Sequence, residues 1–222
     1  MLDQVRNIKA VLLAGLIVVG LGVHCAPVQA ASEKVLTVAG GCFWCVESDF
    51  ESVEGVREVV SGYTGGTLDS PTYKDVTRGG SGHFEAVQIS YDPGVVSVDQ
   101  LLALYFRSVD PTDDGGQFCD RGHSYRTAIF VADDAEREAA EAAKAEAARE
   151  LGQEIVTPIL GTAEFYDAED YHQDYYKGTK IVLTRFGPKK QSKAYKAYRK
   201  ACGRDARVKE LWGADAPFVG KH

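Results

Sequence analysis

The stretch Gly40-Gly41-Cys42-Phe43-Trp44-Cys45-Val46-Glu47 decides the fold of this chain. A β-prone apolar run over residues 35–39 leads into the two glycines, and an amphipathic helical pattern begins at the first cysteine. We therefore predict a strand, a tight turn and a helix whose first turn carries Cys42. Unpaired N–H groups and the positive end of the helix dipole favour a thiolate there. The pattern predicts that Cys42 is a nucleophile.

Hydrophobic periodicity places the other elements. The predicted helix over residues 42–52 puts Phe43, Val46 and Phe50 on one face. Strands are expected over residues 56–63, 84–91, 125–132 and 155–160, and helices over residues 97–109 and 133–151. The first six elements follow the split βαβ, ferredoxin-like order. We predict an α+β two-layer sandwich followed by an extended, partly helical, basic C-terminal tail.

The first thirty residues resemble an export signal. Arg6 and Lys9 precede an apolar run over residues 10–23, and Ala26-Pro27-Val28-Gln29-Ala30 has small residues where a signal peptidase cuts. The run of about 14 residues is short of the roughly 20 that a membrane span needs. We predict cleavage after Ala30 and export to a bacterial periplasm; retention as a membrane anchor is the alternative.

The charge of the chain limits its partners. Its formal net charge is −7, and losing the leader removes more cations than anions. This balance does not favour nucleic acid, and no stable membrane association is expected after cleavage. We predict a signal peptide over residues 1–30, a catalytic domain over 31–187 and a tail over 188–222. Nothing in the sequence requires more than a monomer.

Four cysteines follow the leader: Cys42, Cys45, Cys119 and Cys202. Cys42 and Cys45 are three residues apart in sequence, which places them on neighbouring positions of one helix face. Their spacing suits a redox dithiol, half of a metal site or a structural disulfide. Aromatic residues between them argue against a metal knuckle, and the second pair is not a CxxC. We expect no metal and no cofactor.

Two long polar loops, residues 64–82 and 110–122, and the elements beside them carry acids and phenols. Glu85 begins a predicted strand, where desolvation would raise its pKa and make it a general acid. The alternative is an exposed glutamate on a strand edge. Tyr73 and Tyr125 offer phenolic hydrogen-bond donors but also suit a core. Asp120 and His172 are candidates for the site, with a turn and a surface position as their alternatives.

Taken together, these segments resemble the A class of peptide methionine sulfoxide reductases. The matching motifs follow the order found in that family and span about residues 34–177. They are Gly41-Cys42-Phe43-Trp44 with Glu47, Gly62-Tyr63-Thr64-Gly65-Gly66, Pro71-Thr72-Tyr73, Gly82-His83-Phe84-Glu85-Ala86-Val87, Tyr91-Asp92-Pro93, Asp120-Arg121-Gly122, Ser124-Tyr125-Arg126 and Ala168-Glu169-Asp170-Tyr171-His172-Gln173.

The resemblance implies a role for each group that acts on the sulfoxide. Cys42 attacks the sulfoxide sulfur, and protonated Glu85 gives its proton to the oxygen. Tyr73 and Tyr125 hydrogen-bond that oxygen. The reaction releases methionine and leaves Cys42 as a sulfenic acid.

The resemblance also implies how the substrate is held and which substrates are used. Phe43 and Trp44 wall an apolar slot for the terminal methyl, and Asp120 helps to hold the substrate backbone. A chiral slot selects the S epimer of methionine sulfoxide, in oxidised proteins and peptides and as the free amino acid. The expected role is repair of oxidised exported proteins.

The resemblance implies that a second thiol condenses the sulfenic acid to a disulfide, which a thioredoxin-type dithiol then reduces. Cys202 is our first choice for this resolving cysteine, because it lies in a C-terminal segment that we expect to be mobile, next to a glycine. Cys45 is the second choice and Cys119 the third. The chain departs from the commonest family pattern here, with Cys45 where glycine is usual and His123 where threonine is frequent.

Two other functions compete with this interpretation. A thioredoxin-like protein disulfide oxidoreductase would exchange disulfides through Cys42 and Cys45 and would not need Glu85 or Tyr73. An exported binding domain would use Cys42–Cys45 and Cys119–Cys202 as structural disulfides, and its sulfurs would be unreactive.

Overall fold

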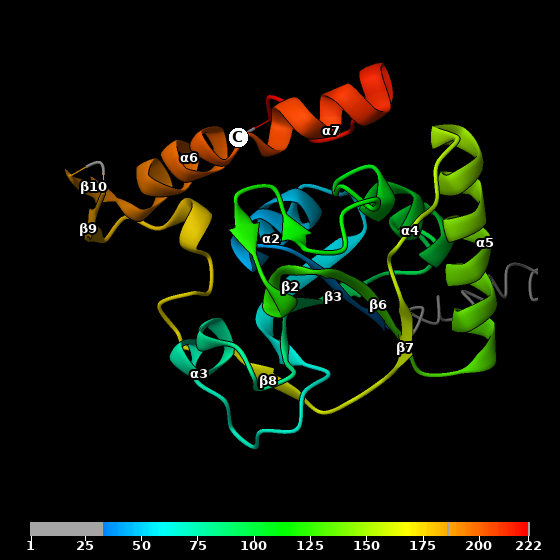
Figure 1. Ribbon diagram of the computed structural model, residues 1–222, viewed down its shortest axis with the longest axis horizontal. Helices are drawn as coiled ribbons and strands as arrows, with labels where there is room; N and C mark the ends of the chain where they lie inside the picture. Colours follow the sequence, from blue (N-terminus) through cyan, green and yellow to red (C-terminus); the bar gives the residue numbers. More distant parts are fainter. Residues whose placement is uncertain (1–32, 186, 222) are drawn as a thin grey trace, which may run out of the picture. The chain divides into compact units, whose positions relative to one another are not determined.

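A mixed sheet of strand order β7-β6-β1-β3-β2-β8 forms the centre of the fold (Figure 1). The structure is a computed structural model that describes residues 33–185 and 187–221, so the predicted leader lies outside the described residues. All neighbouring strands are antiparallel except β6 and β7. The strands are β1 (Lys34–Gly40), β2 (Val56–Thr64), β3 (Phe84–Tyr91), β6 (Thr127–Val131), β7 (Ile159–Gly161) and β8 (Phe165–Asp167).

The four inner strands and two helices confirm the predicted ferredoxin-like core. Strand order β6-β1-β3-β2 with α2 (Phe43–Glu51) and α4 (Val98–Phe106) is the split βαβ arrangement. Ser97 caps α4 in a capping box with Gln100. The longer α5 (Asp134–Leu151) packs against α4, starts at the cap Asp133 and ends at Gly152. The α+β class and the main boundaries are therefore as predicted.

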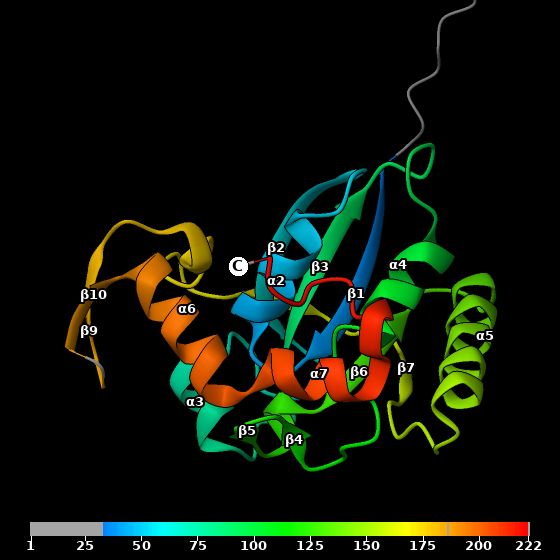
Figure 2. The same cartoon turned by 90° about the horizontal axis from the view of Figure 1, so that it is seen from above.

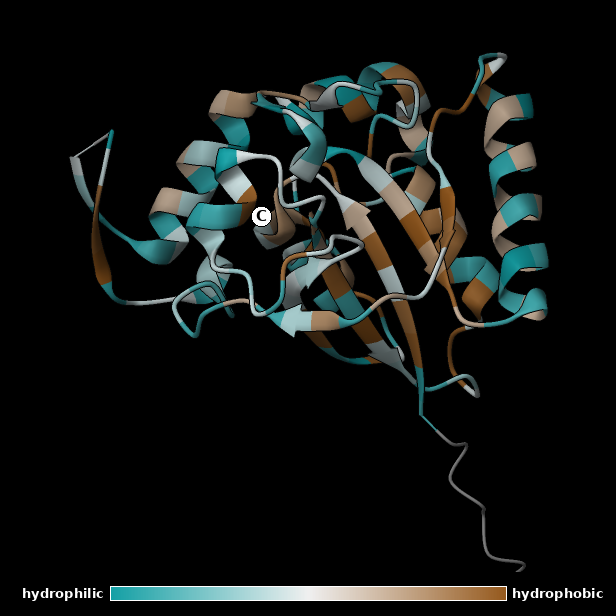
Figure 3. Cartoon of the chain, turned by 60° about the horizontal axis from the view of Figure 1, so that its bottom comes forward, coloured by the Kyte–Doolittle hydropathy of each residue, from teal (hydrophilic) through white to brown (hydrophobic). Residues whose placement is uncertain are grey.

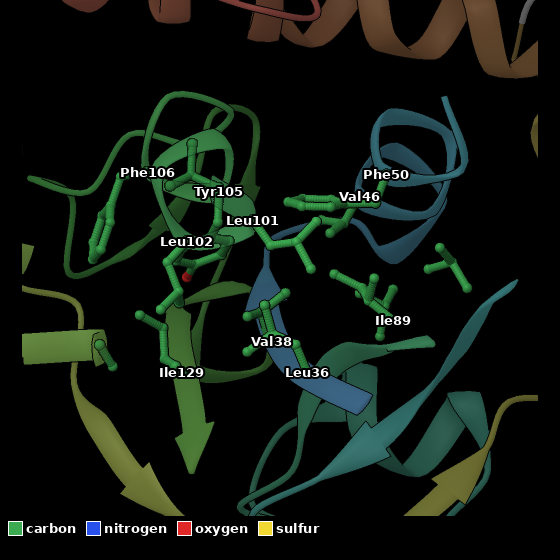
Figure 4. Packing of buried hydrophobic residues seen from close by; sticks show 14 of the residues in the cluster. Leu36, Val38, Val46, Phe50, Ile89, Leu101, Leu102, Tyr105, Phe106 and Ile129 are labelled. Atoms are coloured by element: carbon green, nitrogen blue, oxygen red, sulfur yellow. The ribbon is translucent and has the colours of Figure 1, made fainter. Parts of the chain in front are cut away.

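The core lies between the sheet and the helices α2 and α4. Val46 and Phe50 of α2 meet Leu36 and Val38 of β1 and Ile89 of β3 (Figure 4). The side of the core toward β6 is filled from α4 and β6, by Leu101, Leu102, Tyr105, Phe106 and Ile129. All of these side chains are buried, so the helix that carries the cysteines is fixed to the sheet along its whole apolar face.

The turn between β1 and α2 requires its two glycines. Gly41 has φ +80°, in the region that L-residues avoid, and a Cβ there would lie 2.6 Å from the Cβ of Gln117. A Cβ on Gly40 would lie 3.0 Å from both Val109 and Val46. The turn therefore sets the position of Cys42 through a close approach that no side chain permits.

Three local predictions need correction. The loop predicted over residues 64–82 contains a short helix, α3 (Tyr73–Arg78), which Thr72 and Asp75 cap reciprocally. The loop over residues 110–122 contains a two-stranded ribbon, β4 (Gly116–Gln117) with β5 (Asp120–Arg121). The strand predicted over residues 155–160 begins only at Ile159, because Pro158 has no N–H to give to a ladder.

The C-terminal tail is folded onto the core. It comprises a hairpin, β9 (Ile181–Thr184) with β10 (Gly187–Lys190), and the helices α6 (Gln191–Cys202) and α7 (Arg204–Trp212) (Figure 2). Val208 and Trp212 belong to the main core cluster, and Phe218 packs on Phe50 with ring centroids 5.8 Å apart. The described residues 33–185 and 187–221 thus belong to one compact unit. None of the helices described is both long and apolar enough to cross a membrane.

Candidate active site

Cys42 is the N-cap of α2, as the sequence predicted. Its carbonyl accepts hydrogen bonds from Cys45 N–H (3.0 Å) and Val46 N–H (3.4 Å), and its side chain caps nothing. The thiol is therefore free for chemistry, and it lines a cavity of about 320 Å³. The cavity walls include all seven residues predicted to catalyse or to hold substrate: Cys42, Phe43, Trp44, Tyr73, Glu85, Asp120 and Tyr125.

Glu85 is buried in a central strand of the sheet. The alternative of an exposed edge glutamate does not apply, because β3 lies between β1 and β2 and the residue is only 1% exposed. Its Oε2 accepts the Phe43 N–H at 3.1 Å, and no hydrogen-bond partner is found for Oε1. Burial raises the pKa of Glu85 to about 8, with the charges of Asp120 and Cys45 adding to the effect. Glu85 is thus a carboxylic acid at neutral pH, facing the cavity.

Two phenols stand beside that acid. The Tyr125 hydroxyl interacts with the Tyr73 hydroxyl and with the Glu85 carboxyl, and both tyrosines line the cavity. Burial raises the pKa of each phenol, so both keep their protons at neutral pH. The first turn of α3 positions Tyr73, whose own N–H bonds Glu169 Oε1 at 3.0 Å. These groups together can hydrogen-bond and protonate an oxygen bound in the cavity.

Cys42 and Cys45 form a coupled pair, and the role of Cys42 as the nucleophile stays a prediction. The Cys42 thiol donates a hydrogen bond to the Cys45 sulfur; this bond, burial and the nearby acids raise the pKa of Cys42 well above its ordinary value. The same bond, with the cations Arg204 and Arg199, lowers the pKa of Cys45 to about 7. The two cysteines thus titrate as one coupled pair, with the cations on the side of Cys45 and the acids on the side of Cys42.

An aromatic layer closes one side of the cavity. The Trp44 ring stacks on Tyr175, with ring centroids 3.8 Å apart and an interplanar angle of 6°. The centroids of Phe43 and Tyr73 are 6.4 Å apart. The His172 ring packs against both Phe43 and Tyr73, with ring centroids 5.0 Å and 4.5 Å apart. Burial lowers the pKa of His172 to about 4, so its ring is neutral packing. The wall is apolar, and it suits a methyl or thioether group.

Asp120 joins the cavity to the tail. The Tyr198 hydroxyl of α6 donates a hydrogen bond to Asp120 Oδ1. Burial raises the pKa of Asp120, whereas this hydrogen bond and the cations Arg204 and Arg185 oppose that effect. Asp120 is therefore a site residue, not a simple turn residue.

Cys202 has a partner other than Cys42. It forms a disulfide with Cys119, the residue before Asp120, and this bridge ties the end of α6 to the active-site loop. Among the described residues, Cys42 and Cys45 are the free cysteines. A bond between Cys202 and Cys42 stays a prediction for a state in which the Cys119–Cys202 disulfide is reduced.

Sequence reasoning missed the contribution of the tail. Tyr175, Thr184, Arg185, Ala194 and Tyr198 complete the cavity wall. No motif pointed to them, because the aromatic and basic residues after position 174 suit a solvated surface equally well. Only the return of α6 across the open end of the site shows their role.

A second omission lies beneath α2. Arg199 donates to Asp49 at 2.8 Å, and Arg204 lies 3.8 Å from the same buried carboxylate. Arg204 also donates to the carbonyls of Gly40 (3.1 Å) and Ser108 (3.0 Å). The tail thus holds the end of β1 and brings two cations near Cys45, which is not part of the cavity wall. Two buried arginines are rare enough that sequence alone gives no reason to expect them.

Glu47, which we quoted only as part of a motif, ties three segments together. Its Oε2 accepts from Ser61 at 2.8 Å and its Oε1 from the Asp174 N–H at 2.6 Å. Burial raises the pKa of Glu47 to about 7. Glu47 lies outside the cavity wall, so its contribution is to hold α2 against β2 and against the backbone at Asp174.

Comparison with known proteins gives consistent results along the whole described chain. The sequence model of the family described as peptide methionine sulfoxide reductase matches residues 34–215. The peptide methionine sulfoxide reductase MsrA 2 of Caulobacter vibrioides is 49% identical, over 94% of this chain and 99% of its own. The protein of the same name from Rhizobium meliloti is 46% identical, over 87% of this chain and 90% of its own.

Solved structures agree with the sequence comparison. The reduced form of Mxr1 from Saccharomyces cerevisiae superimposes with a TM-score of 0.63 and 35% identity, covering 65% of this chain and 84% of that one. Methionine sulfoxide reductase A of Corynebacterium diphtheriae gives a TM-score of 0.59 and 32% identity, covering 65% and 74%. The similarity therefore extends from sequence to fold.

Proposed function

Because the chain belongs to the A class of peptide methionine sulfoxide reductases, we propose that Cys42 and Glu85 are the groups that carry out its reaction. The enzyme reduces the S epimer of methionine sulfoxide to methionine at the expense of thiols. A sulfoxide is reduced by attack on sulfur combined with protonation of oxygen. The single observation that carries the proposal is a buried, protonated carboxyl in the same cavity as a free thiol at a helix start.

The substrate is bound with its methyl group against the ring of Trp44. Phe43 and the aromatic residues behind it exclude water from this wall. The sulfoxide oxygen then accepts hydrogen bonds from Tyr73, Tyr125 and the Glu85 carboxyl, which line the cavity together with Cys42. Asp120 is placed to accept a backbone N–H of the substrate. The sulfur thereby meets the Cys42 thiol with its lone pair and methyl group fixed, which selects one epimer.

The first chemical step oxidises Cys42. Its proton moves to the Cys45 thiolate as the Cys42 sulfur bonds the substrate sulfur, and Glu85 gives its proton to the oxygen. The S–O bond then breaks, the hydroxyl passes to the Cys42 sulfur, and the thioether leaves. The sulfoxide gains two electrons and Cys42 loses two, ending as a sulfenic acid.

The second step closes a disulfide. In the state that the structure describes, Cys45 touches Cys42 and Cys202 is bonded to Cys119. We assign the first condensation to Cys45: its sulfur attacks the Cys42 sulfenic acid, a disulfide forms, and the hydroxyl leaves as water. Cys202, our first choice from sequence, remains a proposed resolver once its own disulfide is reduced. A thioredoxin-type dithiol restores the enzyme by thiol–disulfide exchange.

The setting of the enzyme is part of the proposal. The leader pattern supports export to a periplasm, where methionine sulfoxide in exported proteins and free methionine sulfoxide are the available substrates. We propose that the enzyme acts as a monomer, unattached to membrane once its leader is removed. The thioredoxin-like alternative loses its basis, because the strand order and the family are those of another fold.

One assay tests the function. The protein lacking residues 1–30 is incubated with dithiothreitol and racemic methionine sulfoxide blocked at both termini. We expect up to half of the substrate to be reduced, leaving the R epimer, as measured by chiral chromatography. No reduction by the wild-type protein would contradict the function, and loss of both epimers would contradict the chiral slot.

A further inference from the structure

The tail hairpin carries an apolar face that nothing in the described chain covers. Ile181 is 75% exposed and Leu183 is 86% exposed, more than any other large apolar side chain described. Both point to the same face of β9, because side chains alternate along a strand. Pro188 of β10 lies opposite Leu183. We call Ile181, Leu183 and Pro188 the hairpin patch; Figure 3 shows β9 as a hydrophobic strand at the edge of the molecule.

The hairpin patch is continuous with the active site. Thr184 and Arg185, the residues directly after Leu183, line the cavity. Val182, on the opposite face of β9, packs into the cluster that contains Cys42 and Cys45. One face of the strand thus packs on the cluster of the two cysteines, and the other carries the hairpin patch, which ends next to Thr184 and Arg185 of the cavity wall.

The size of the cavity limits what it can hold. At about 320 Å³ it lies at the low end of small-molecule pockets. It therefore holds the methionine sulfoxide side chain, and the neighbouring residues of a polypeptide substrate must lie on the surrounding surface. The hairpin patch is the apolar part of that surface.

Oxidised polypeptides bring apolar neighbours with them. Methionine packs in cores and apolar interfaces, and its oxidation to a polar sulfoxide disrupts them. The exposed segment around a sulfoxide is accordingly often one whose other side chains were buried before. Such side chains are complementary to the hairpin patch.

Charge argues against a second copy of this chain as the occupant. Residues 175–203 contain seven lysines and two arginines but no aspartate or glutamate, whereas the whole chain has a net charge of −7. A symmetric dimer through the hairpin patch would bring two such basic segments together. Like charges facing each other oppose that contact, and they favour a partner with neutral or acidic residues.

We propose that the hairpin patch is the docking surface for the polypeptide on either side of the methionine sulfoxide, and that it selects apolar flanking residues. This inference rests on the proposed function, since it needs the sulfoxide to occupy the cavity. The cavity recognises the oxidised side chain, and the hairpin patch recognises the unfolded apolar chain that carries it.

The test compares a large and a small substrate. Two blocked peptides carry one methionine sulfoxide, flanked by leucine and valine in one and by glycine and serine in the other; the small substrate is the blocked single residue. In Ile181→Ser/Leu183→Ser we expect kcat/KM for the apolar peptide to fall about tenfold, through KM, because the apolar area buried on docking is lost. Reduction of the glycine–serine peptide and of the single residue should keep its wild-type rate.

Val95→Ser is the matched control, since Val95 is a 55% exposed apolar side chain outside the cavity wall. It should leave all three substrates unchanged. Equal kcat/KM for the apolar peptide in the double variant and in wild type would overturn the proposal, and so would an equal loss on all three substrates. A wild-type dimer that the double variant dissociates would show a self-association surface instead. Failure of the wild type on the single residue would contradict the proposed function, not the docking surface.

Discussion

At the scale of single residues, the site contains one group that keeps its proton at neutral pH and one group that gives its proton up. Glu85 keeps a proton because burial opposes its charge, and Cys45 gives one up because Cys42 and two arginines stabilise its thiolate. In the proposed reaction Glu85 is the acid for the sulfoxide oxygen, and Cys45 is the base for the Cys42 thiol. Acid and base are matched to a reaction that adds a proton to oxygen and removes one from sulfur.

The rate of methionine sulfoxide reduction should follow a bell-shaped pH profile. It rises as the cysteine pair loses its first proton near pH 7, and it falls as Glu85, with a pKa of about 8, loses its proton. In Glu85→Gln the first turnover should be roughly 10²- to 10⁴-fold slower, and the alkaline fall should disappear. Rapid-quench measurement of methionine release checks both. Glu58→Gln, on the exposed part of β2, is the control, and a near-normal rate in Glu85→Gln would remove the acid role.

Cys45 should be needed at two steps, since it takes the proton of Cys42 before methionine is released and condenses with the sulfenic acid afterwards. Cys45→Ser is therefore expected to form a stoichiometric amount of methionine more slowly than the wild type and to accumulate the Cys42 sulfenic acid, which dimedone traps. In the wild type, Cys42 and Cys45 should be joined in a disulfide after this turnover. Proteolytic digestion should therefore give the peptide of residues 35–57 with neither of these cysteines alkylated. Cys202→Ser should behave like wild type in this single turnover. A Cys42–Cys202 peptide in the wild type would assign the condensation to Cys202.

At the scale of elements, the turn from β1 to α2 and the two tail helices place the nucleophile. The sequence made the turn visible, because paired glycines between a strand pattern and a helix pattern have few other uses. It did not reveal the tail, since the contacts of Arg204 with Gly40 span 164 residues and leave no local pattern. The missed α3 was locally encoded by its capping box, which we had not used.

Gly41→Ala should lower both stability and activity. Its φ of +80° and the contact with Gln117 predict a loss of about 1–3 kcal/mol in the free energy of unfolding. Gly152→Ala is the matched control: it has a φ of +63°, but a Cβ there meets nothing within 4 Å, so the loss should stay near 1 kcal/mol. Urea denaturation measures both, and equal losses would show that the close approach is unimportant.

Arg204→Met should destabilise the protein by about 3–5 kcal/mol, because Asp49 loses one of its buried cations and two buried carbonyls lose their donor. Arg207→Met, on the same helix, removes partly exposed ion pairs with Asp110 and Glu210 and should cost about 1 kcal/mol or less. The denaturant midpoints of the two variants measure this difference in stability. Similar midpoints would mean that the buried network contributes little to stability.

At the scale of the whole molecule, one disulfide joins the tail to the catalytic loop. Cys119 and Cys202 are 83 residues apart in sequence, so the bridge closes a long loop of the unfolded chain. Reduction should therefore lower the free energy of unfolding by about 2–4 kcal/mol. Thermal unfolding with and without dithiothreitol measures this, and Cys119→Ser/Cys202→Ser should show no such difference. An unchanged wild-type midpoint would contradict a structural contribution of the bridge.

The sequence by itself determined the sandwich fold, the position of Cys42 at a helix start and the set of predicted site residues that line one cavity. These depend on local patterns: a hydrophobic period, a glycine turn and short motifs whose residues keep their chemistry wherever they are placed. Only the tertiary structure decided which cations lie near the cysteine pair, which sulfur Cys202 bonds, and that the tail forms a wall of the cavity. Those outcomes depend on burial and on long-range contacts, and neither the burial of Cys45 against Arg199 and Arg204 nor the return of α6 over the site is written in any local stretch.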